Sequence, residues 1–248
     1  MSSGLDSTAA FLRLIKENQN ISDIYFPVYI WWKSASNIVL KKEFENCIQI
    51  IEYIRKKNPK TSKNIKDLIK VDVPLVFYEN IKSDYNDNKQ EGYWPHFRNG
   101  IFILSSISYL LNYLKLRDYS QFEKISIVVG FIGNVIDEDI SFVNNMKRLL
   151  NEALSNPKTK KRSGFIEMTK EIDFYHPYLT DEDVSYSIHP YFDIEKFADS
   201  DILKYTWSCW KNYDTHCHKC GGCKIREEKY LKFKEAGGKI KDHFFENY

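Results

Sequence analysis

Apolar and polar residues follow two rhythms along this chain, and the rhythms predict alternating helices and strands. Apolar residues at helical spacing predict helices over Thr8–Glu17 and Val39–Lys57. Runs rich in β-branched and aromatic residues predict buried strands over Ile21–Trp32 and Val71–Tyr78. The first third of the chain is therefore expected to begin with a helix and to alternate from there.

The same alternation continues in the middle of the chain. The apolar run Gly100–Leu114 predicts a buried helix, because it is shorter than the roughly 20 residues that a membrane span needs. A strand is predicted over Lys124–Gly133 and a helix over Ser141–Leu154. Strands that alternate with helices predict a parallel sheet covered on both faces, and hence the α/β fold class.

Composition narrows the class of protein. A chain of 248 residues is long enough for one large α/β domain or two small ones. Its 36 Lys and Arg against 34 Asp and Glu give a net charge of +2, which argues against a protein that coats DNA broadly. Polar residues follow Met1, so no secretory signal is expected there. We expect a cytoplasmic protein without a membrane partner.

The cysteines predict a metal centre. Four of the five lie within fifteen residues near the end of the chain, in the pattern C-x7-C-x2-C-x2-C. Four thiolates suit a closed structural Zn²⁺ site, and an iron–sulfur cluster is the chemical alternative. The expected ligands are Cys209, Cys217, Cys220 and Cys223. His216 and His218 are expected to be surface neighbours rather than ligands, and Cys47 a core thiol.

The chain opens with MSSGLDSTAAFLRL, in which small polar residues stand directly before a helical pattern. This stretch is either an ordinary helix cap or a phosphate cradle, because a helix start offers unpaired N–H groups and partial positive charge. Gly4 would let the backbone approach a phosphate, and Asp6 would either cap the helix or organise Mg²⁺ on a triphosphate. The candidate cradle comprises Ser2, Ser3, Gly4, Leu5, Asp6, Ser7 and Thr8.

Three motifs resemble one enzyme family. SSGLDST resembles the S-G-G-x-D-S pyrophosphate loop of the PP-loop ATP pyrophosphatases, with Ser3 in place of the first glycine. TWSC, followed by C-x2-C-x2-C and by FKEAG, resembles the C-terminal zinc motif of the 7-cyano-7-deazaguanine synthase (QueC) family of PP-loop enzymes. WPHFRNGIFILSS resembles that family's V-P-x-R-N-G/A-x-F-L-S segment through Pro95, Arg98, Asn99 and Gly100.

The resemblance implies a Rossmann-like PP-loop domain over residues 1–205 and a zinc-binding segment over residues 206–248. Family members have a strand before the loop, so the first strand is either lost here or lies upstream of the given start. The implied nucleotide site joins the loop to Arg98, Asn99 and Gly100, with Asp6 and Arg98 as catalytic residues. Arg98 would bind a phosphate or a carboxylate, or else cap a neighbouring helix end.

The resemblance also implies a reaction. ATP with Mg²⁺ would activate 7-carboxy-7-deazaguanine by adenylation, with release of pyrophosphate, and ammonia would displace AMP. A second activation would convert the resulting amide to the nitrile, 7-cyano-7-deazaguanine, for the queuosine pathway. Homodimer formation stays open. The acceptor-binding segments have diverged, since Tyr29–Ser36 and Gly133–Leu150 lack the family's motifs and leave Asp137, Glu138 and Asp139 as polar remnants.

That divergence leaves two alternatives. A related enzyme in phage defence or DNA modification would join the activated deazaguanine to another acceptor, such as a protein amine. A non-catalytic protein would keep the zinc centre for folding while it binds a nucleotide or nucleic acid. On the sequence alone, Asp6→Asn is expected to leave the melting temperature unchanged, because Asn also caps helices well.

Overall fold

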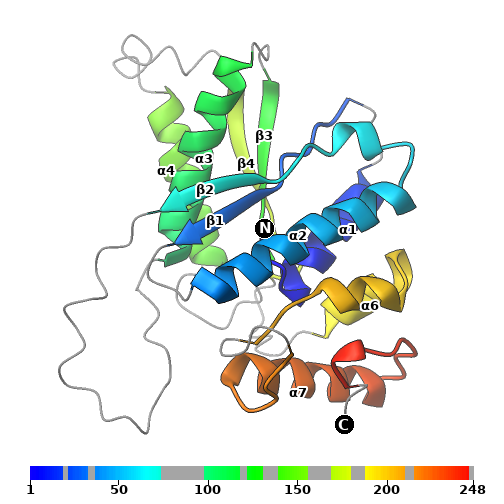
Figure 1. The fold of residues 1–248 in the computed structure, drawn as a ribbon. Coiled ribbons are helices and arrows are strands. Elements are labelled where there is room, and N and C mark those ends of the chain that lie inside the picture. Colours follow the sequence, from blue (N-terminus) through cyan, green and yellow to red (C-terminus); the bar gives the residue numbers. More distant parts are fainter. Residues whose placement is uncertain are drawn as a thin grey trace, which may run out of the picture. The chain divides into compact units, whose positions relative to one another are not determined.

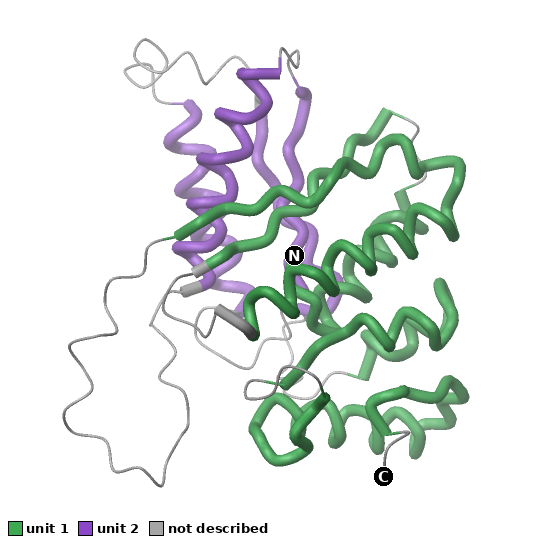
Figure 2. Tube along the Cα trace, viewed as in Figure 1, with its two compact units in different colours: residues 1–94, 186–248 green, residues 95–185 purple. Residues whose placement is uncertain are grey.

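The structure of this protein is a computed structural model that describes residues 1–18, 22–32, 37–73, 98–117, 122–130, 139–155, 169–179, 188–209 and 215–245. The chain divides into two compact units (Figure 2). Unit 1 contains residues 1–94 and 186–248, and unit 2 contains residues 95–185. Unit 1 is therefore built from both ends of the chain, and residues 206–248 lie within it.

Unit 1 contains two strands and four α-helices among its described residues, with short 3₁₀ turns between them (Figure 1). Its first part consists of α1 (Leu5–Glu17), β1 (Val28–Trp32), α2 (Asn37–Lys57), η1 (Ser62–Asn64) and β2 (Ile69–Val73). Its second part consists of α6 (His189–Phe197), η3 (Ser200–Tyr205), α7 (Gly221–Glu235) and η4 (His243–Phe245).

β1 and β2 form a parallel pair whose register runs from Val28 opposite Ile69 to Trp32 opposite Val73. A parallel pair needs a crossover, and α2 provides it. Side chains of β2 alternate between buried and exposed, as expected where one face of a strand meets the core. The two strands and α2 therefore make one β-α-β element.

The second part of unit 1 packs onto the first, because α6 lies against α1 and η3 lies against α2. Within the second part, α6 lies against α7. Two glycines end α7, and Gly237 has φ of +88°, which favours glycine. A Cβ at Gly238 would lie 2.1 Å from the ring of Phe233. The FKEAG motif thus marks a tight helix end that packs on a buried aromatic ring.

Unit 2 consists of α3 (Arg98–Leu116), β3 (Phe122–Val128), α4 (Ile140–Ser155) and β4 (Thr169–Tyr175). β3 and β4 are parallel and paired from Phe122 opposite Thr169 to Val128 opposite Tyr175. The amide of Asn151 on α4 hydrogen-bonds both backbone groups of Ile172, at 2.7 and 2.9 Å. Unit 2 is therefore a second β-α-β element. The Asn151 side chain stabilises it by bonding the backbone of Ile172 as a neighbouring strand would.

The α/β class with parallel strands is confirmed, but the elements differ in detail from the expectation. The described strands form two separate parallel pairs rather than one sheet. β1 begins only at Val28, because Pro27 has no N–H, and before it Tyr25 pairs alone with Ile65. Tyr78, Gly133 and the segment around Pro95 lie outside the described residues. No helix in the described ranges is long and apolar enough to cross a membrane.

Candidate functional site

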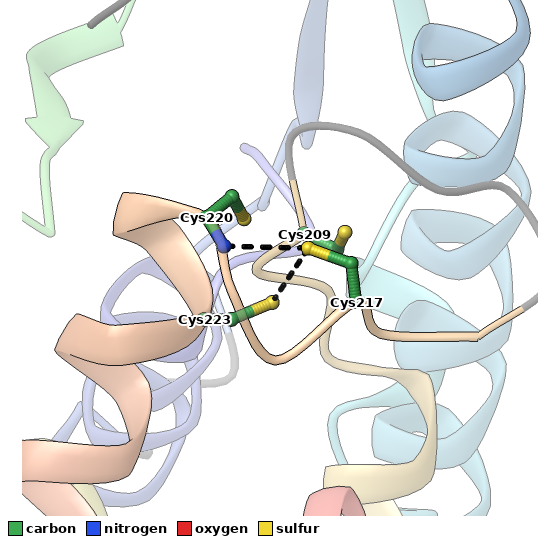
Figure 3. A group of neighbouring side chains, drawn as sticks. All are labelled: Cys209, Cys217, Cys220 and Cys223. Carbon is green, nitrogen blue, oxygen red and sulfur yellow. Dashed lines mark hydrogen bonds between the residues drawn. The ribbon is translucent and has the colours of Figure 1, made fainter. Parts of the chain in front are cut away.

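Four cysteine sulfurs gather at one point in unit 1 (Figure 3). The Sγ atoms of Cys209, Cys217, Cys220 and Cys223 all lie within 4.8 Å of one another. In a tetrahedral zinc site the sulfurs stand about 3.8 Å apart, given Zn–S bonds of about 2.3 Å. The observed spacing needs little contraction, so this group can hold a metal ion such as zinc, as the sequence predicted.

Backbone geometry directs these sulfurs inward. His218 has φ of +55°, which turns the chain between Cys217 and Cys220. The N–H of Cys220 then donates to the Cys217 sulfur at 3.3 Å (Figure 3). Burial alone would raise the pKa of Cys217, but backbone N–H groups of Lys219 and Cys220 outweigh it and, with neighbouring thiols, lower it to about 6. A lowered pKa favours the thiolate form of Cys217, and the thiolate is the form that binds a metal.

Cys220 is also the N-cap of α7, and Cys223 lies in the first turn of that helix. The partial positive charge of a helix N-terminus favours negatively charged groups in this position. The candidate metal centre is therefore built on the start of α7, with Cys209 joining from the segment that follows η3. Three buried thiols and one half-buried thiol leave little water at the sulfurs.

Aromatic residues surround the cysteines. The ring of His216 lies 4.3 Å from that of Trp207 and 4.7 Å from that of Phe244, and its Nε2 accepts a hydrogen bond from the Ser208 N–H. Burial, followed by the charge of Arg226, lowers the pKa of His216 to about 3. The imidazole of His216 is therefore neutral and packs beside the cysteine cluster. The histidines lie outside the four-ligand group, as expected, although His216 is packed rather than a surface residue.

A buried ion pair ties the end of the chain to the segment that carries the cysteines. Arg226 is 2% exposed and forms a bidentate pair with Asp242 at 2.7 and 2.8 Å. The same guanidinium donates to the backbone carbonyls of Thr206 and Leu203. Tyr191 on α6 donates to Asp242 at 2.5 Å. This network fixes α7 relative to the TWSC segment without involving the metal.

The N-terminal loop forms the start of α1, with Gly4 as N-cap in an extended conformation. The hydroxyl of Ser7 donates to the Ser2 carbonyl at 2.7 Å and lies 2.9 Å from the Ser2 hydroxyl. The Thr8 hydroxyl donates to the Gly4 carbonyl at 2.9 Å, and Leu5 is buried. Gly4 has no side chain with which to cap α1, and the Ser2 hydroxyl accepts from the Gly4 N–H at 3.3 Å, so the hydroxyls of Ser2 and Ser7 stand at the helix start.

Hydrogen bonds connect the N-terminal loop to two other segments of unit 1. The amino group of Met1 donates to the carbonyl of Val28 on β1. Ser3 is fully buried, and its carbonyl accepts from the N–H of Trp207 at 2.8 Å. The Ser3 hydroxyl has no hydrogen-bond partner within the described part of the chain. The segment that leads to Cys209 therefore lies directly against the candidate cradle.

Asp6 does not cap the helix. Both of its carboxylate oxygens accept from the Nζ atom of Lys229 on α7, at 2.8 and 2.9 Å. Lys229 is 3% exposed, and the Asp6 side chain is 26% exposed. Sequence reasoning missed Lys229. A usable signal was its spacing, since Arg226, Lys229 and Phe233 form a buried stripe at helical intervals.

The third motif opens α3 in unit 2. Asn99 is buried, and a Cβ at Gly100 would lie 3.6 Å from the ring of Phe142, an ordinary contact. The side chain of Arg98 lies outside the described residues. Because the N-terminal loop belongs to unit 1, the expected convergence of Arg98 with that loop stays a prediction.

The diverged acceptor segments are only partly described. Trp31 packs edge-on against the rings of Tyr29 and Phe44, with the Lys70 ammonium 3.9 Å from its ring centre, so it has a packing role. Asp139 accepts from the Phe142 N–H and caps α4. Residues 33–36 and 131–138, with Asp137 and Glu138, lie outside the described part.

No protein-family model matches the chain, and no curated protein is significantly similar to it. The kinship implied by the three motifs therefore remains a hypothesis.

Proposed function

We propose that this chain is an ATP pyrophosphatase of the PP-loop type that activates a carboxylate by adenylation. The supporting observation is the loop from Ser2 to Thr8, where hydroxyls of Ser2 and Ser7 stand at the start of α1. The first N–H groups of a helix have no partner within it and favour anions. A parallel β-α-β element in the same unit is consistent with this fold type.

In this proposal the loop binds the two phosphates that leave. A carboxylate oxygen of the acceptor attacks the α-phosphorus of ATP, the bond to the β-phosphate oxygen breaks, and pyrophosphate departs. Backbone N–H groups and the hydroxyls of Ser2 and Ser7 stabilise the developing charge. Gly4 keeps the approach open, since a Cβ there would lie 3.2 Å from the Ser2 hydroxyl. A nucleophile then displaces AMP from the acyl-adenylate.

Two cofactors differ in how well the residues fit them. The four cysteines suit zinc, which would fix the start of α7 and take no part in the chemistry. Asp6 does not fit Mg²⁺ as it stands, because Lys229 occupies both carboxylate oxygens. No step of the proposed reaction is therefore assigned to a metal ion at Asp6.

The acceptor is proposed from the resemblance alone. It would be 7-carboxy-7-deazaguanine, with ammonia as the nucleophile that gives the amide. A second adenylation, on the amide oxygen, would let AMP leave with that oxygen to give the nitrile. A protein amine is the alternative nucleophile, and mass spectrometry of the product distinguishes the two.

A second candidate function is favoured by one contact. The pairing of Lys229 with Asp6 neutralises the loop in the way that a purely structural ion pair does. A non-catalytic zinc-containing protein that binds a nucleotide or nucleic acid would show this contact and form no AMP.

The test measures AMP and pyrophosphate formed from ATP, 7-carboxy-7-deazaguanine and ammonia by the zinc-loaded chain. Replacing both Ser2 and Ser7 with Ala should lower AMP formation about a hundredfold, the scale for lost preorganised donors. Ser62→Ala, which removes an exposed hydroxyl on η1, is the matched control and should keep full activity. Absence of AMP with the wild-type chain would refute the enzymatic proposal and favour the second candidate.

A further inference from the structure

The contact between α7 and the N-terminal loop places a charged group where a metal ion was expected. Asp6 was expected to organise Mg²⁺, yet the Lys229 ammonium lies 2.8 and 2.9 Å from its two oxygens. The lysine is almost completely buried, whereas a quarter of the Asp6 side chain reaches solvent. The cation therefore stands behind the carboxylate, on the protein side.

The electrostatics of this arrangement oppose a divalent ion at the same carboxylate. A Mg²⁺ ion would need an Asp6 oxygen at about 2.1 Å, close to an ammonium that already holds both oxygens. The positive charges of the ion and of Lys229 would repel each other, and displacement of the lysine would leave a buried ammonium without a counter-charge, which is costly. The ammonium is thus the favoured cation for Asp6.

The position of Lys229 depends on the segment that carries the cysteines. Lys229 lies six residues after Cys223 on the same helix, and Arg226 anchors that helix through Asp242. The segment also reaches the loop through Trp207, whose N–H donates to the Ser3 carbonyl. Lys229 therefore reaches the loop from a helix that is anchored by buried contacts.

An ammonium group has three donors, and the hydrogen bonds that Lys229 makes within the described residues use two of them, both on Asp6. The third donor has no hydrogen-bond partner within the described residues. The Ser3 hydroxyl, fully buried and without a partner in the described part, is a second unused polar group there.

We propose that Lys229 takes the place of a divalent cation at Asp6 and supplies, from within the protein, the positive charge that balances this carboxylate in the N-terminal loop. A pyrophosphate group at this loop would then meet the lysine without a metal ion at Asp6. The second statement rests on the proposed function, whereas the first is independent of it.

The first statement is tested with Mn²⁺ alone, by electron paramagnetic resonance of the zinc-loaded full chain. Wild type should bind Mn²⁺ weakly, and Lys229→Met should bind one further ion at least about tenfold more tightly, because Asp6 is released. The double variant Asp6→Asn with Lys229→Met should lose that ion. Lys232→Met is the matched control, since it removes an exposed lysine of α7 paired with Glu228, and it should behave as wild type.

Equal Mn²⁺ affinity in wild type and Lys229→Met would overturn the proposal. If Lys229→Met fails to fold, as judged by circular dichroism, Lys229→Gln removes the charge while it keeps hydrogen-bond donors and answers the same question.

The second statement is tested with pyrophosphate in buffer free of added divalent cations. Wild type should bind pyrophosphate, and Lys229→Met should bind it at least about tenfold more weakly. If wild type binds pyrophosphate only when Mg²⁺ is present, the proposal that Lys229 supplies the positive charge is wrong. Absence of pyrophosphate binding under all conditions, together with the expected Mn²⁺ results, would refute the proposed function and leave the role of Lys229 at Asp6 intact.

Discussion

Asp6 and Lys229 lie 223 positions apart in the sequence and meet as a hydrogen-bonded ion pair. Nothing local marks either residue for the other, because each stands on its own helix among further charged residues. The contact changes what Asp6 is expected to do. The first role of Asp6 is therefore that of counter-ion to the buried Lys229, whichever ligand binds at the loop.

The stability of Asp6→Asn separates these roles. The amide keeps the size of the side chain but removes the counter-charge of a buried ammonium, so we expect a loss of about 1–3 kcal/mol in the free energy of unfolding. This lies below the cost of breaking a fully buried pair, because Asp6 is partly exposed. Urea unfolding at pH 7 measures it.

Adding Lys229→Met to Asp6→Asn should restore most of the lost stability, since no unpaired charge remains. A melting temperature for Asp6→Asn equal to that of wild type would agree with the sequence-based expectation and contradict the structural one.

The cysteine cluster could be predicted from sequence, and helical spacing could indicate the burial of Lys229, but the pairing of Lys229 with Asp6 could not be predicted. Cys217, Cys220 and Cys223 lie so close along the chain that a turn and the start of a helix bring their sulfurs together. Their chemistry narrows the interpretation further, because four thiols in one short segment have few other uses. A long-range pair such as Asp6 with Lys229 depends on how α1 and α7 are placed, which no local pattern states.

At the scale of elements, the strongly periodic helices could be predicted to within a few residues, and the weaker elements could not. The helix expected over Ser141–Leu154 is α4, Ile140–Ser155, whose start is fixed by the Asp139 cap. The sequence did not predict β4, because Ile172 and Phe174 are the buried residues among its described side chains and charged residues lie beside them. A short strand of that kind is recognised by its partner, β3, rather than by its own sequence.

Charged residues on β3, α4 and β4 predict how the second β-α-β element responds to acid. Partial burial would raise the pKa of Asp173, but hydrogen bonds from Lys124 and Lys147 outweigh it and lower the pKa well below its usual range. A carboxylate with a lowered folded pKa contributes stability that is complete above about pH 4 and is lost as the pH falls further.

Asp173→Asn should therefore destabilise the protein by about 1 kcal/mol at pH 7, as expected for a half-exposed pair. The difference from wild type should shrink as the pH falls below about 4, where the unfolded chain binds the proton first. Urea unfolding of both proteins along a pH series measures it, and metal loss at low pH affects both alike. A difference that stays constant or grows toward low pH would contradict the assignment.

At the scale of the whole molecule, the sequence indicated the α/β class but not the division of the chain. Residues 1–94 and 186–248 form one unit around a middle segment that forms another. A sequence pattern reports which faces are apolar, and it does not report which of two distant segments covers them. The pairing of the chain's two ends could therefore be seen only in the structure, although it decides what surrounds the candidate loop.

This arrangement predicts where the protein loosens when its metal is removed. Purified protein should contain about one zinc per chain, bound by the four cysteines, and Cys220→Ser should lose it. Without the metal the start of α7 and the TWSC segment lose a common anchor. Trp207 holds Ser3 and Lys229 holds Asp6, so the N-terminal loop should loosen together with the C-terminal segment.

Hydrogen exchange followed by mass spectrometry tests this coupling. After chelation, or in Cys220→Ser, exchange should become faster in residues 1–8 and 206–235, while β3 and β4 keep their protection because unit 2 has its own core. Lys229→Met with zinc bound should loosen residues 1–8 alone. Faster exchange confined to the cysteine segment would show that the metal centre and the loop are independent, and faster exchange everywhere would show that the two units unfold as one.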